Sequence, residues 1–168
     1  MSFDDVLSDA FLYPTVKKEK PVKVFSKSEV SLALLDLQIA LKTSHDGCRQ
    51  VGSSLINGEG VDLDLVAKVK DIEYSKDLLV AAGYTLSSSG SGSGDEFCCF
   101  RKGDVNVMIT ESQTWFDNFV KSARACRVVT LQGFQLDKAA RIAIHRVIMN
   151  GESPEEAIYT ARKGATCL

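Results

Sequence analysis

The chain carries almost no net charge, because 20 Lys and Arg residues offset 22 Asp and Glu residues to leave a formal charge of −2. Without a global basic field a protein does not gather long nucleic acid, so any contact with a polynucleotide must be a local patch. No stretch approaches the ~20 apolar residues of a membrane span, and the first residues lack a basic and then apolar signal segment. We therefore expect a cytoplasmic protein that makes no membrane contact.

Cysteine is scarce and irregularly placed. The five cysteines, at 48, 98, 99, 126 and 167, are odd in number and lack the Cys-x-x-Cys spacing of zinc knuckles and redox motifs. Two interpretations stay open, reduced thiols in a cytosolic protein and a metal role, and the composition favours the first.

The chain is long enough for one compact domain and too short for two full catalytic domains, with 168 residues of which 45% are hydrophobic and 25% charged. Residues 1–22 form an acidic opening and a lysine-rich cluster that ends at Pro21, without a periodic pattern. We expect an extended N-terminal arm over 1–22 and a single domain over 23–168.

The pattern of apolar residues, caps and turns predicts an alternation of helices and strands. Helices are expected over 27–43, 72–82, 112–125, 136–149 and 153–163, and strands over 48–51, 61–69, 96–102 and 104–110, the last two around Gly103. A short helix starts near Ser53, a further strand begins at 84–86, and the serine- and glycine-rich segment 85–94 is expected to be a solvent loop. This order predicts an α/β (α+β) fold, a mixed β-sheet with helices mainly on one face.

Two aspartates alternate with apolar residues in the central predicted strand. Asp62 and Asp64 point to one face, while Leu63 and Leu65 point to the core. Adjacent carboxylates repel and are costly to desolvate unless a divalent cation lies between them. A solvated acidic face is the alternative, but the pattern favours a magnesium site.

A Gly-Ser pair lies upstream of these acids. Gly52 permits close approach of the backbone, and the hydroxyls of Ser53 and Ser54 are suited to phosphate oxygens. The combination resembles the nucleotidyltransferases of the DNA polymerase β type, which carry an apolar residue, Gly, Gly or Ser, a loop, and Asp-x-Asp between apolar residues. The resemblance covers roughly residues 48–120, with a loop of only eight residues between Ser53 and Asp62.

The family also has a third carboxylate on a later strand. Asp104 opens the run 104–110, and Asn106 lies two residues later on the same face. The region 103–110 resembles predicted phage nucleotidyltransferases. We favour Asp104, because a neutral amide ligates magnesium poorly and cannot act as a base. In this interpretation Asp62, Asp64 and Asp104 are the metal ligands and catalytic residues, with Asp104 as the proton acceptor.

The resemblance implies a magnesium-dependent enzyme, with two ions, that moves a nucleoside monophosphate from an NTP to a hydroxyl and releases pyrophosphate. The acceptor would be an RNA or tRNA end, a protein or a small molecule. The alternative is a protein that keeps the nucleotide cleft but only binds and sequesters a macromolecular partner.

Cations on the later predicted helices are candidate binding residues. Lys121 and Arg124 lie one turn apart, where a cation could reach the triphosphate, although the pattern favours solvated surface charge. Arg141, His145 and Arg146 form a second group that suits either an RNA or protein acceptor or an ordinary soluble helix face.

Overall fold

The computed structural model describes residues 20–90, 97–164 and 166–167. Nearly all of the predicted arm at 1–22, and residues 91–94 of the predicted serine- and glycine-rich loop, lie outside the described residues. The described part of the chain contains no helix that is both long enough and apolar enough to cross a membrane.

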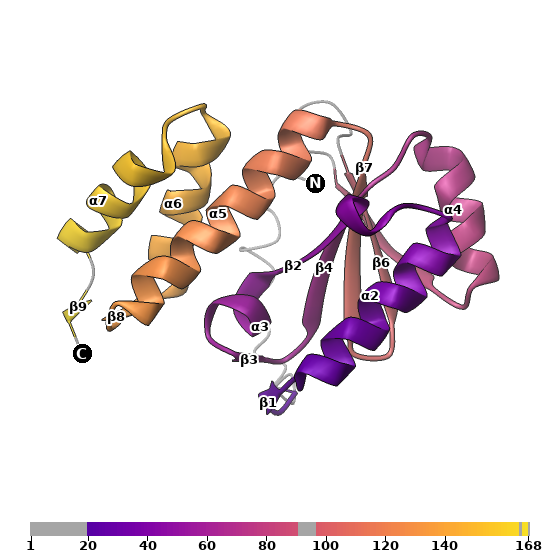
Figure 1. Ribbon diagram of the computed structural model, residues 1–168, viewed down its shortest axis with the longest axis horizontal. Helices are drawn as coiled ribbons and strands as arrows, with labels where there is room; N and C mark the ends of the chain where they lie inside the picture. Colours follow the sequence, from indigo (N-terminus) through magenta and orange to yellow (C-terminus); the bar gives the residue numbers. More distant parts are fainter. Residues whose placement is uncertain (1–19, 91–96, 165, 168) are drawn as a thin grey trace, which may run out of the picture.

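A mixed five-stranded sheet forms the centre of the fold (Figure 1). Across the sheet the order is β2 (Cys48–Val51), β4 (Leu63–Lys68), β7 (Val105–Thr110), β6 (Phe97–Lys102) and β5 (Thr85–Gly90). The central strands β4 and β7 are parallel, and every other neighbouring pair is antiparallel. The predicted α+β class with a mixed sheet is confirmed.

One strand is longer than its side chains indicate. The sequence predicts a loop from residue 85, but β5 continues to Gly90, in antiparallel register with β6 and with an irregularity between Leu86 and Ser88. A serine- and glycine-rich segment has little to bury, but its backbone N–H and C=O groups still gain partners from the ladder. The prediction of a loop is therefore wrong for residues 87–90.

One face of the sheet is covered by α2 (Lys27–Leu41) and α4 (Ile72–Ala81). The Ser26 hydroxyl accepts the Glu29 N–H at 3.1 Å, so the predicted cap at the start of α2 is formed. The core on this face consists of apolar side chains of both helices and of strands β4, β6 and β7, among them Leu37, Leu41, Leu63, Leu65, Leu79, Phe100, Val107 and Ile109.

The opposite face receives the first half of α5 (Gln113–Leu131). Trp115 and Phe116 pack there with Val66 of β4 and Met108 of β7. The helix runs past the predicted end at residue 125, although this segment is rich in β-branched residues. Val129 is fully buried in the next cluster, so tertiary packing outweighs the local propensity.

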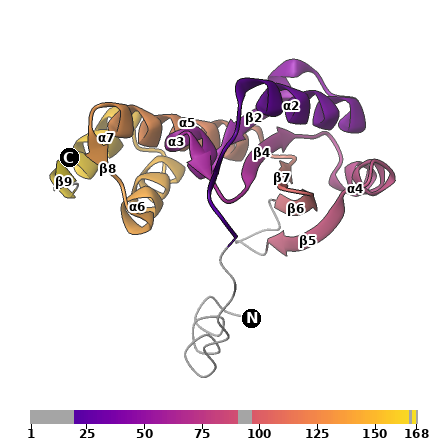
Figure 2. The ribbon, with the colours of Figure 1, turned by 90° about the horizontal axis from the view of Figure 1, so that it is seen from below.

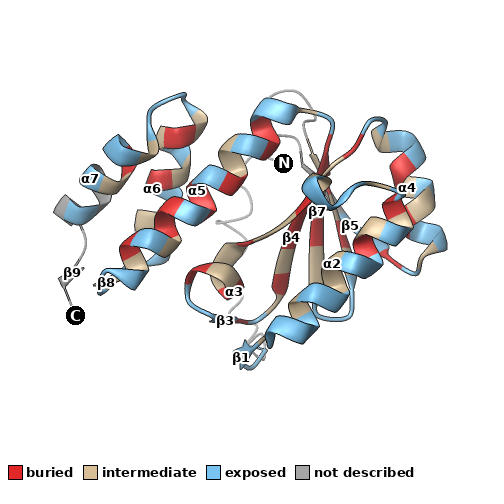
Figure 3. Ribbon diagram, viewed as in Figure 1, coloured by how far each residue is buried: buried red, intermediate tan, exposed pale blue. Residues whose placement is uncertain are grey.

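The second half of α5 joins α6 (Lys138–Met149) and α7 (Pro154–Gly164) in a helical group beside the sheet (Figure 2). Buried residues line the sides of these helices that face one another, as Figure 3 shows. The short α3 (Gly52–Ile56) connects the two halves, because Ile56 enters the helical cluster and Arg127 donates to the Leu55 carbonyl. The remaining short elements are β1 (Lys23–Val24), η1 (His45–Gly47), β3 (Glu59–Gly60), β8 (Phe134–Gln135) and β9 (Thr166–Cys167).

Candidate functional site

Three polar residues form a row across the central strands. Asp64 of β4 is in register with Asn106 of β7, which is in register with Arg101 of β6. Residues in register on neighbouring strands present their side chains to the same face. The Asn106 amide donates from Nδ2 to Oδ1 of Asp64 at 3.0 Å, which joins the two parallel strands at the site.

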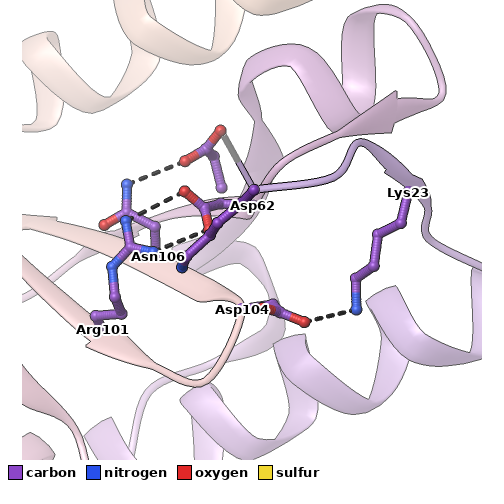
Figure 4. A network of polar contacts seen from close by, with 7 residues as sticks. Lys23, Asp62, Arg101, Asp104 and Asn106 are labelled. Carbon is purple, nitrogen blue, oxygen red and sulfur yellow. Dashed lines mark hydrogen bonds and ion pairs between the residues drawn. The ribbon is translucent and has the colours of Figure 1, made fainter. Parts of the chain in front are cut away.

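Asp62 precedes β4 and is held by Arg101 (Figure 4). The guanidinium donates from Nη1 to Oδ1 at 2.9 Å and from Nη2 to Oδ2 at 3.2 Å, a two-pronged contact. Lys20 places its Nζ 3.8 Å from Oδ1 of the same carboxylate. The charge of Asp62 is therefore balanced by cations of the chain itself.

Asp64 is the electrostatically costly member of the site. Burial raises the pKa of its carboxyl above the ordinary 3.8, and the nearby negative charge of Asp62 acts in the same direction. The hydrogen bond from Asn106 and the charge of Arg101 oppose this rise without cancelling it. A cation or a further donor at Asp64 would therefore be stabilising.

Asp104, the third metal ligand of the sequence prediction, forms an ion pair with Lys23, and the charges of Arg101 and Lys20 also act on its carboxyl. Its Oδ2 accepts from Nζ of Lys23 at 2.7 Å, and its side chain is 49% exposed against 22% for Asp62. Figure 4 shows its carboxylate directed toward Lys23 and away from Asp62. Asp104 lies in the turn before β7, and Asn106, two residues further, takes the place beside Asp64. The described residues contain no group of three or more acidic, His or Cys side chains that could hold a metal ion.

The Gly-Ser turn packs directly against Asp64. Gly52 has φ +71, and a Cβ on it would lie 2.2 Å from Oδ2 of Asp64. Both the backbone conformation and the space thus require glycine. The sequence predicts close approach of this backbone to a nucleotide, and the structure adds close approach to the carboxylate.

A cavity of about 390 Å³ opens at this turn, between the sheet and the helical group. It is lined by Gly52, Ser53, Ile56 and Asp64 on one side and by Phe119, Ser122, Ala123, Cys126, Lys138, Arg141, Ile142 and His145 on the other. Ser54 is not in the lining, because it is buried and its hydroxyl accepts from Nε2 of Gln50 at 3.2 Å.

No family model matches this chain, and a search of the curated proteins finds no relative. The chemistry of the site is therefore inferred from its own residues.

The cations of the cavity differ from those favoured by the sequence. Lys121 and Arg124 are exposed on the side of α5 opposite Phe119 and Ser122, and they do not line the cavity. Lys138 and Arg141, on the first turns of α6, line it instead. Lys138, Arg141 and His145 are spaced so that they lie on one face of a helix, and this spacing is the signal for them in the sequence. Because the sequence does not show what that face packs against, it does not favour these residues over Lys121 and Arg124.

His145 is positioned by Ser122. The Ser122 hydroxyl donates to the Phe119 carbonyl at 2.9 Å, and its oxygen lies 2.9 Å from Nδ1 of His145. A hydroxyl has one hydrogen, so when Ser122 donates to the Phe119 carbonyl, Nδ1 of His145 is the donor to the hydroxyl oxygen and Nε2 of the neutral ring keeps its lone pair. Burial lowers the pKa of the ring below 6.5, so His145 is neutral at pH 7. It is a hydrogen-bond acceptor or a base.

Proposed function

We propose that this chain is a magnesium-dependent nucleotidyltransferase, which binds an NTP in the cavity at Gly52 and transfers a nucleoside monophosphate to a hydroxyl. One observation carries the proposal. The turn at Gly52, a position that only glycine can occupy, packs on the Asp64 carboxylate. It lies at the opening of a cavity that is also lined by Lys138 and Arg141. One carboxylate for a metal, that of Asp64, and two cations for a polyphosphate thus line one cavity of ligand size, while Asp62 lies two residues before Asp64 and outside the lining.

The triphosphate would occupy the side of the cavity between Ser53 and α6. The Ser53 hydroxyl is a donor for phosphate oxygens, and Lys138 and Arg141 offset the negative charge from across the cavity. Phe119 provides an apolar surface for the base or sugar. These assignments replace Lys121, Arg124 and Ser54 of the sequence prediction.

The residues present fit one magnesium ion. Magnesium in nucleotide enzymes is commonly held by one or two carboxylates plus the phosphates of the substrate, and Asp62 and Asp64 provide that number. Arg101 uses two of the roughly four acceptor positions of the Asp62 carboxylate and leaves others available. When bound, the ion neutralises the charge of the triphosphate. A second ion has no third carboxylate here, because Asp104 faces Lys23.

The transfer itself requires a proton acceptor. The hydroxyl oxygen of the acceptor forms a bond to the α-phosphorus, the bond from that phosphorus to pyrophosphate breaks, and the hydroxyl proton leaves. We assign this proton to Nε2 of His145, which is neutral and lines the same cavity as Asp64. Asp104, the base in the sequence prediction, lies outside the cavity lining.

The acceptor we favour is an RNA end, including that of tRNA. The exposed Arg146, together with Lys138 and Arg141, makes α6 the basic edge of the cavity, as a local patch for a polynucleotide requires. A protein hydroxyl is the other acceptor that the sequence allows. We place the activity in the cytoplasm, where the unpaired thiols of Cys48, Cys98 and Cys126 stay reduced.

A second candidate function is binding without transfer. Asn106 stands beside Asp64 where a third carboxylate would complete a two-metal site, and a neutral amide ligates magnesium weakly. This observation favours a protein that retains the nucleotide cleft and acts by sequestering a macromolecular partner.

The test is incubation of the protein with magnesium and each α-labelled NTP, alongside RNA, total protein and small-molecule hydroxyl pools. The enzyme predicts transfer of label, lost in Asp64→Ala and kept in Asp104→Ala, which removes an exposed acid outside the cavity. Nucleotide binding without transfer in any pool supports the second function. Absence of both binding and transfer contradicts both.

A further inference from the structure

A second, separate cavity lies at the other end of β4. Its volume is about 480 Å³. The lining residues come from the end of α2, the end of β4 and the first turns of α4 and α5: Leu41, Lys42, Thr43, Ser44, Asp46, Gly47, Lys68, Val69, Lys70, Asp71, Tyr74, Ser75, Gln113 and Phe116. Lys68 follows Asp64 by four residues along β4, which corresponds to ~13 Å of strand. None of the lining residues is shared with the cavity at Gly52.

The position of this cavity is one at which sheets bind ligands. The parallel strands β4 and β7 both end there, at Lys68 and Thr110, and they lead into α4 and α5 respectively. In open sheets ligands bind in the crevice outside the carboxyl ends of parallel strands. The proposed nucleotidyltransferase site lies at the opposite ends of these strands and does not use this crevice.

Three ammonium groups line the cavity without an acidic partner. Within the described ranges, the side chains of Lys42, Lys68 and Lys70 form no ion pair, and their one side-chain hydrogen bond is from Nζ of Lys68 to the Val69 carbonyl at 3.2 Å. Nearby like charges repel and are stabilised by an anion placed between them.

The two acids of the lining are engaged elsewhere. Asp46 lies 3.6 Å from Nη2 of Arg49, and Asp71 accepts the Tyr74 N–H at 2.9 Å as the cap of α4. The lysines therefore keep their charge available for a ligand.

The rest of the lining combines apolar and aromatic side chains with neutral polar ones. Leu41, Val69, Tyr74 and Phe116 form this surface, and the Thr43 and Ser44 hydroxyls add neutral hydrogen-bonding groups. An apolar surface beside convergent polar and charged groups suits a small organic ligand that carries a charged group.

We propose that this cavity binds a small phosphorylated organic molecule, with its phosphate among Lys42, Lys68 and Lys70 and its organic part against Tyr74 and Phe116. A monophosphate of nucleotide size satisfies both halves of the lining. The site is independent of the cavity at Gly52, so it can be occupied whether or not the proposed transfer takes place.

The experiment is calorimetry and ¹⁵N chemical-shift mapping of the full chain with AMP, ribose 5-phosphate, inorganic phosphate and adenosine, all without magnesium. We expect binding of AMP or ribose 5-phosphate that is tighter than that of inorganic phosphate, with shifts at residues 42–47 and 68–75, and no binding of adenosine. Lys70→Gln and Lys68→Gln should each weaken binding by about tenfold or more, because a hydrogen bond to a charged group is lost.

Lys42→Asn is the variant that separates a ligand contact from a structural role. Lys42 is the one described non-glycine residue with a positive φ, 53°, a conformation that Asn tolerates better than Lys. The variant should fold at least as stably as the wild type and still lose affinity. Lys27→Gln, at the far end of α2, is the charge-matched control and should bind normally.

The proposal is overturned if no phosphorylated compound binds, or if inorganic phosphate binds as tightly as AMP. It is also overturned if the three lysine variants bind normally while Lys138→Gln does not, because the ligand would then occupy the cavity at Gly52.

Discussion

Asn106 on β7 donates its side-chain amide to Asp64 on the neighbouring parallel strand, at 3.0 Å. The contact places a neutral donor, rather than a third anion, beside a carboxylate that burial already makes costly to ionise. The charges of Asp62 and Asp64, and more weakly that of Asp104, thus act on the Arg101 guanidinium before any ligand binds. The charge balance of the site can be tested by changing its members one at a time.

Asn106→Asp should make the protein depend on magnesium for stability. The substitution removes the hydrogen bond and adds a third negative charge, so we expect a loss of about 1–3 kcal/mol in the free energy of unfolding without metal. Magnesium should then stabilise the variant more than the wild type, since a ligand that binds the folded state shifts the equilibrium. Urea unfolding with and without magnesium measures both effects. An equal loss under the two conditions would show that no ion enters the site.

Gly52→Ala should be more destabilising than Gly58→Ala. Both glycines have a left-handed backbone, with φ +71 and +74, but a Cβ at Gly58 meets nothing within 4 Å. Gly58→Ala should therefore cost only the conformational term, about 1–2 kcal/mol. At Gly52 the Cβ also collides with the Asp64 carboxylate, so we expect a larger loss together with weaker NTP binding. Thermal unfolding and nucleotide titration of the two variants give the comparison. Equal losses of stability would show that the contact with Asp64 does not contribute.

Most of the longer helices and strands could be predicted from sequence because they depend on local patterns, whereas the ends of β5 and α5 could not. Alternation places Leu63 and Leu65 in the core, and the cap at Ser26 starts α2. The third acid could not be assigned in this way, because the choice between Asp104 and Asn106 depends on strand register. Register is set by pairing across the sheet.

The cavity residues on α6 depend on tertiary packing. Lys138, Arg141 and His145 occupy one face of the helix, but the sequence does not state which neighbour that face meets. The packing of α6 on α5 beside α3 determines it. For the same reason Lys121 and Arg124, plausible by their place in the sequence, lie on the outer side of α5.

Lys138→Gln and Arg141→Gln should weaken NTP binding, whereas Lys121→Gln and Arg124→Gln should not. Each cavity cation that contacts a phosphate contributes a charged hydrogen bond, whose loss corresponds to about tenfold or more in Kd. The second pair removes the same charges from the exposed side of α5 and controls for the overall field. Calorimetry with magnesium and ATP measures the four affinities. A similar loss in both pairs would indicate only nonspecific attraction.

Asp64→Asn should change the pH dependence of stability. The carboxyl has a raised pKa in the folded protein, so the folded state holds its proton more tightly than the unfolded chain. Its ionisation therefore lowers stability as the pH rises from the ordinary 3.8 through the raised pKa, and the penalty is complete above that range. We expect the variant to gain stability relative to the wild type at pH 7 and to lose that advantage towards pH 4. Urea unfolding over pH 4–7 gives the difference, and a difference that does not vary with pH contradicts it.

His145→Gln should separate the chemical step from binding. The ring lines the cavity, and in the tautomer in which Nδ1 donates to Ser122 its Nε2 is unprotonated. If Nε2 receives the proton of the acceptor hydroxyl, its loss should lower kcat by about 10²–10⁴, the usual contribution of a general base. The Kd for the NTP should change little, because the phosphate contacts remain. Ser122→Ala is the matched variant, since it removes the hydroxyl that orients the ring but keeps the imidazole, and it should lower kcat by less. Transfer at the wild-type rate in His145→Gln would exclude His145 as the base. The residue would then have at most a role in binding.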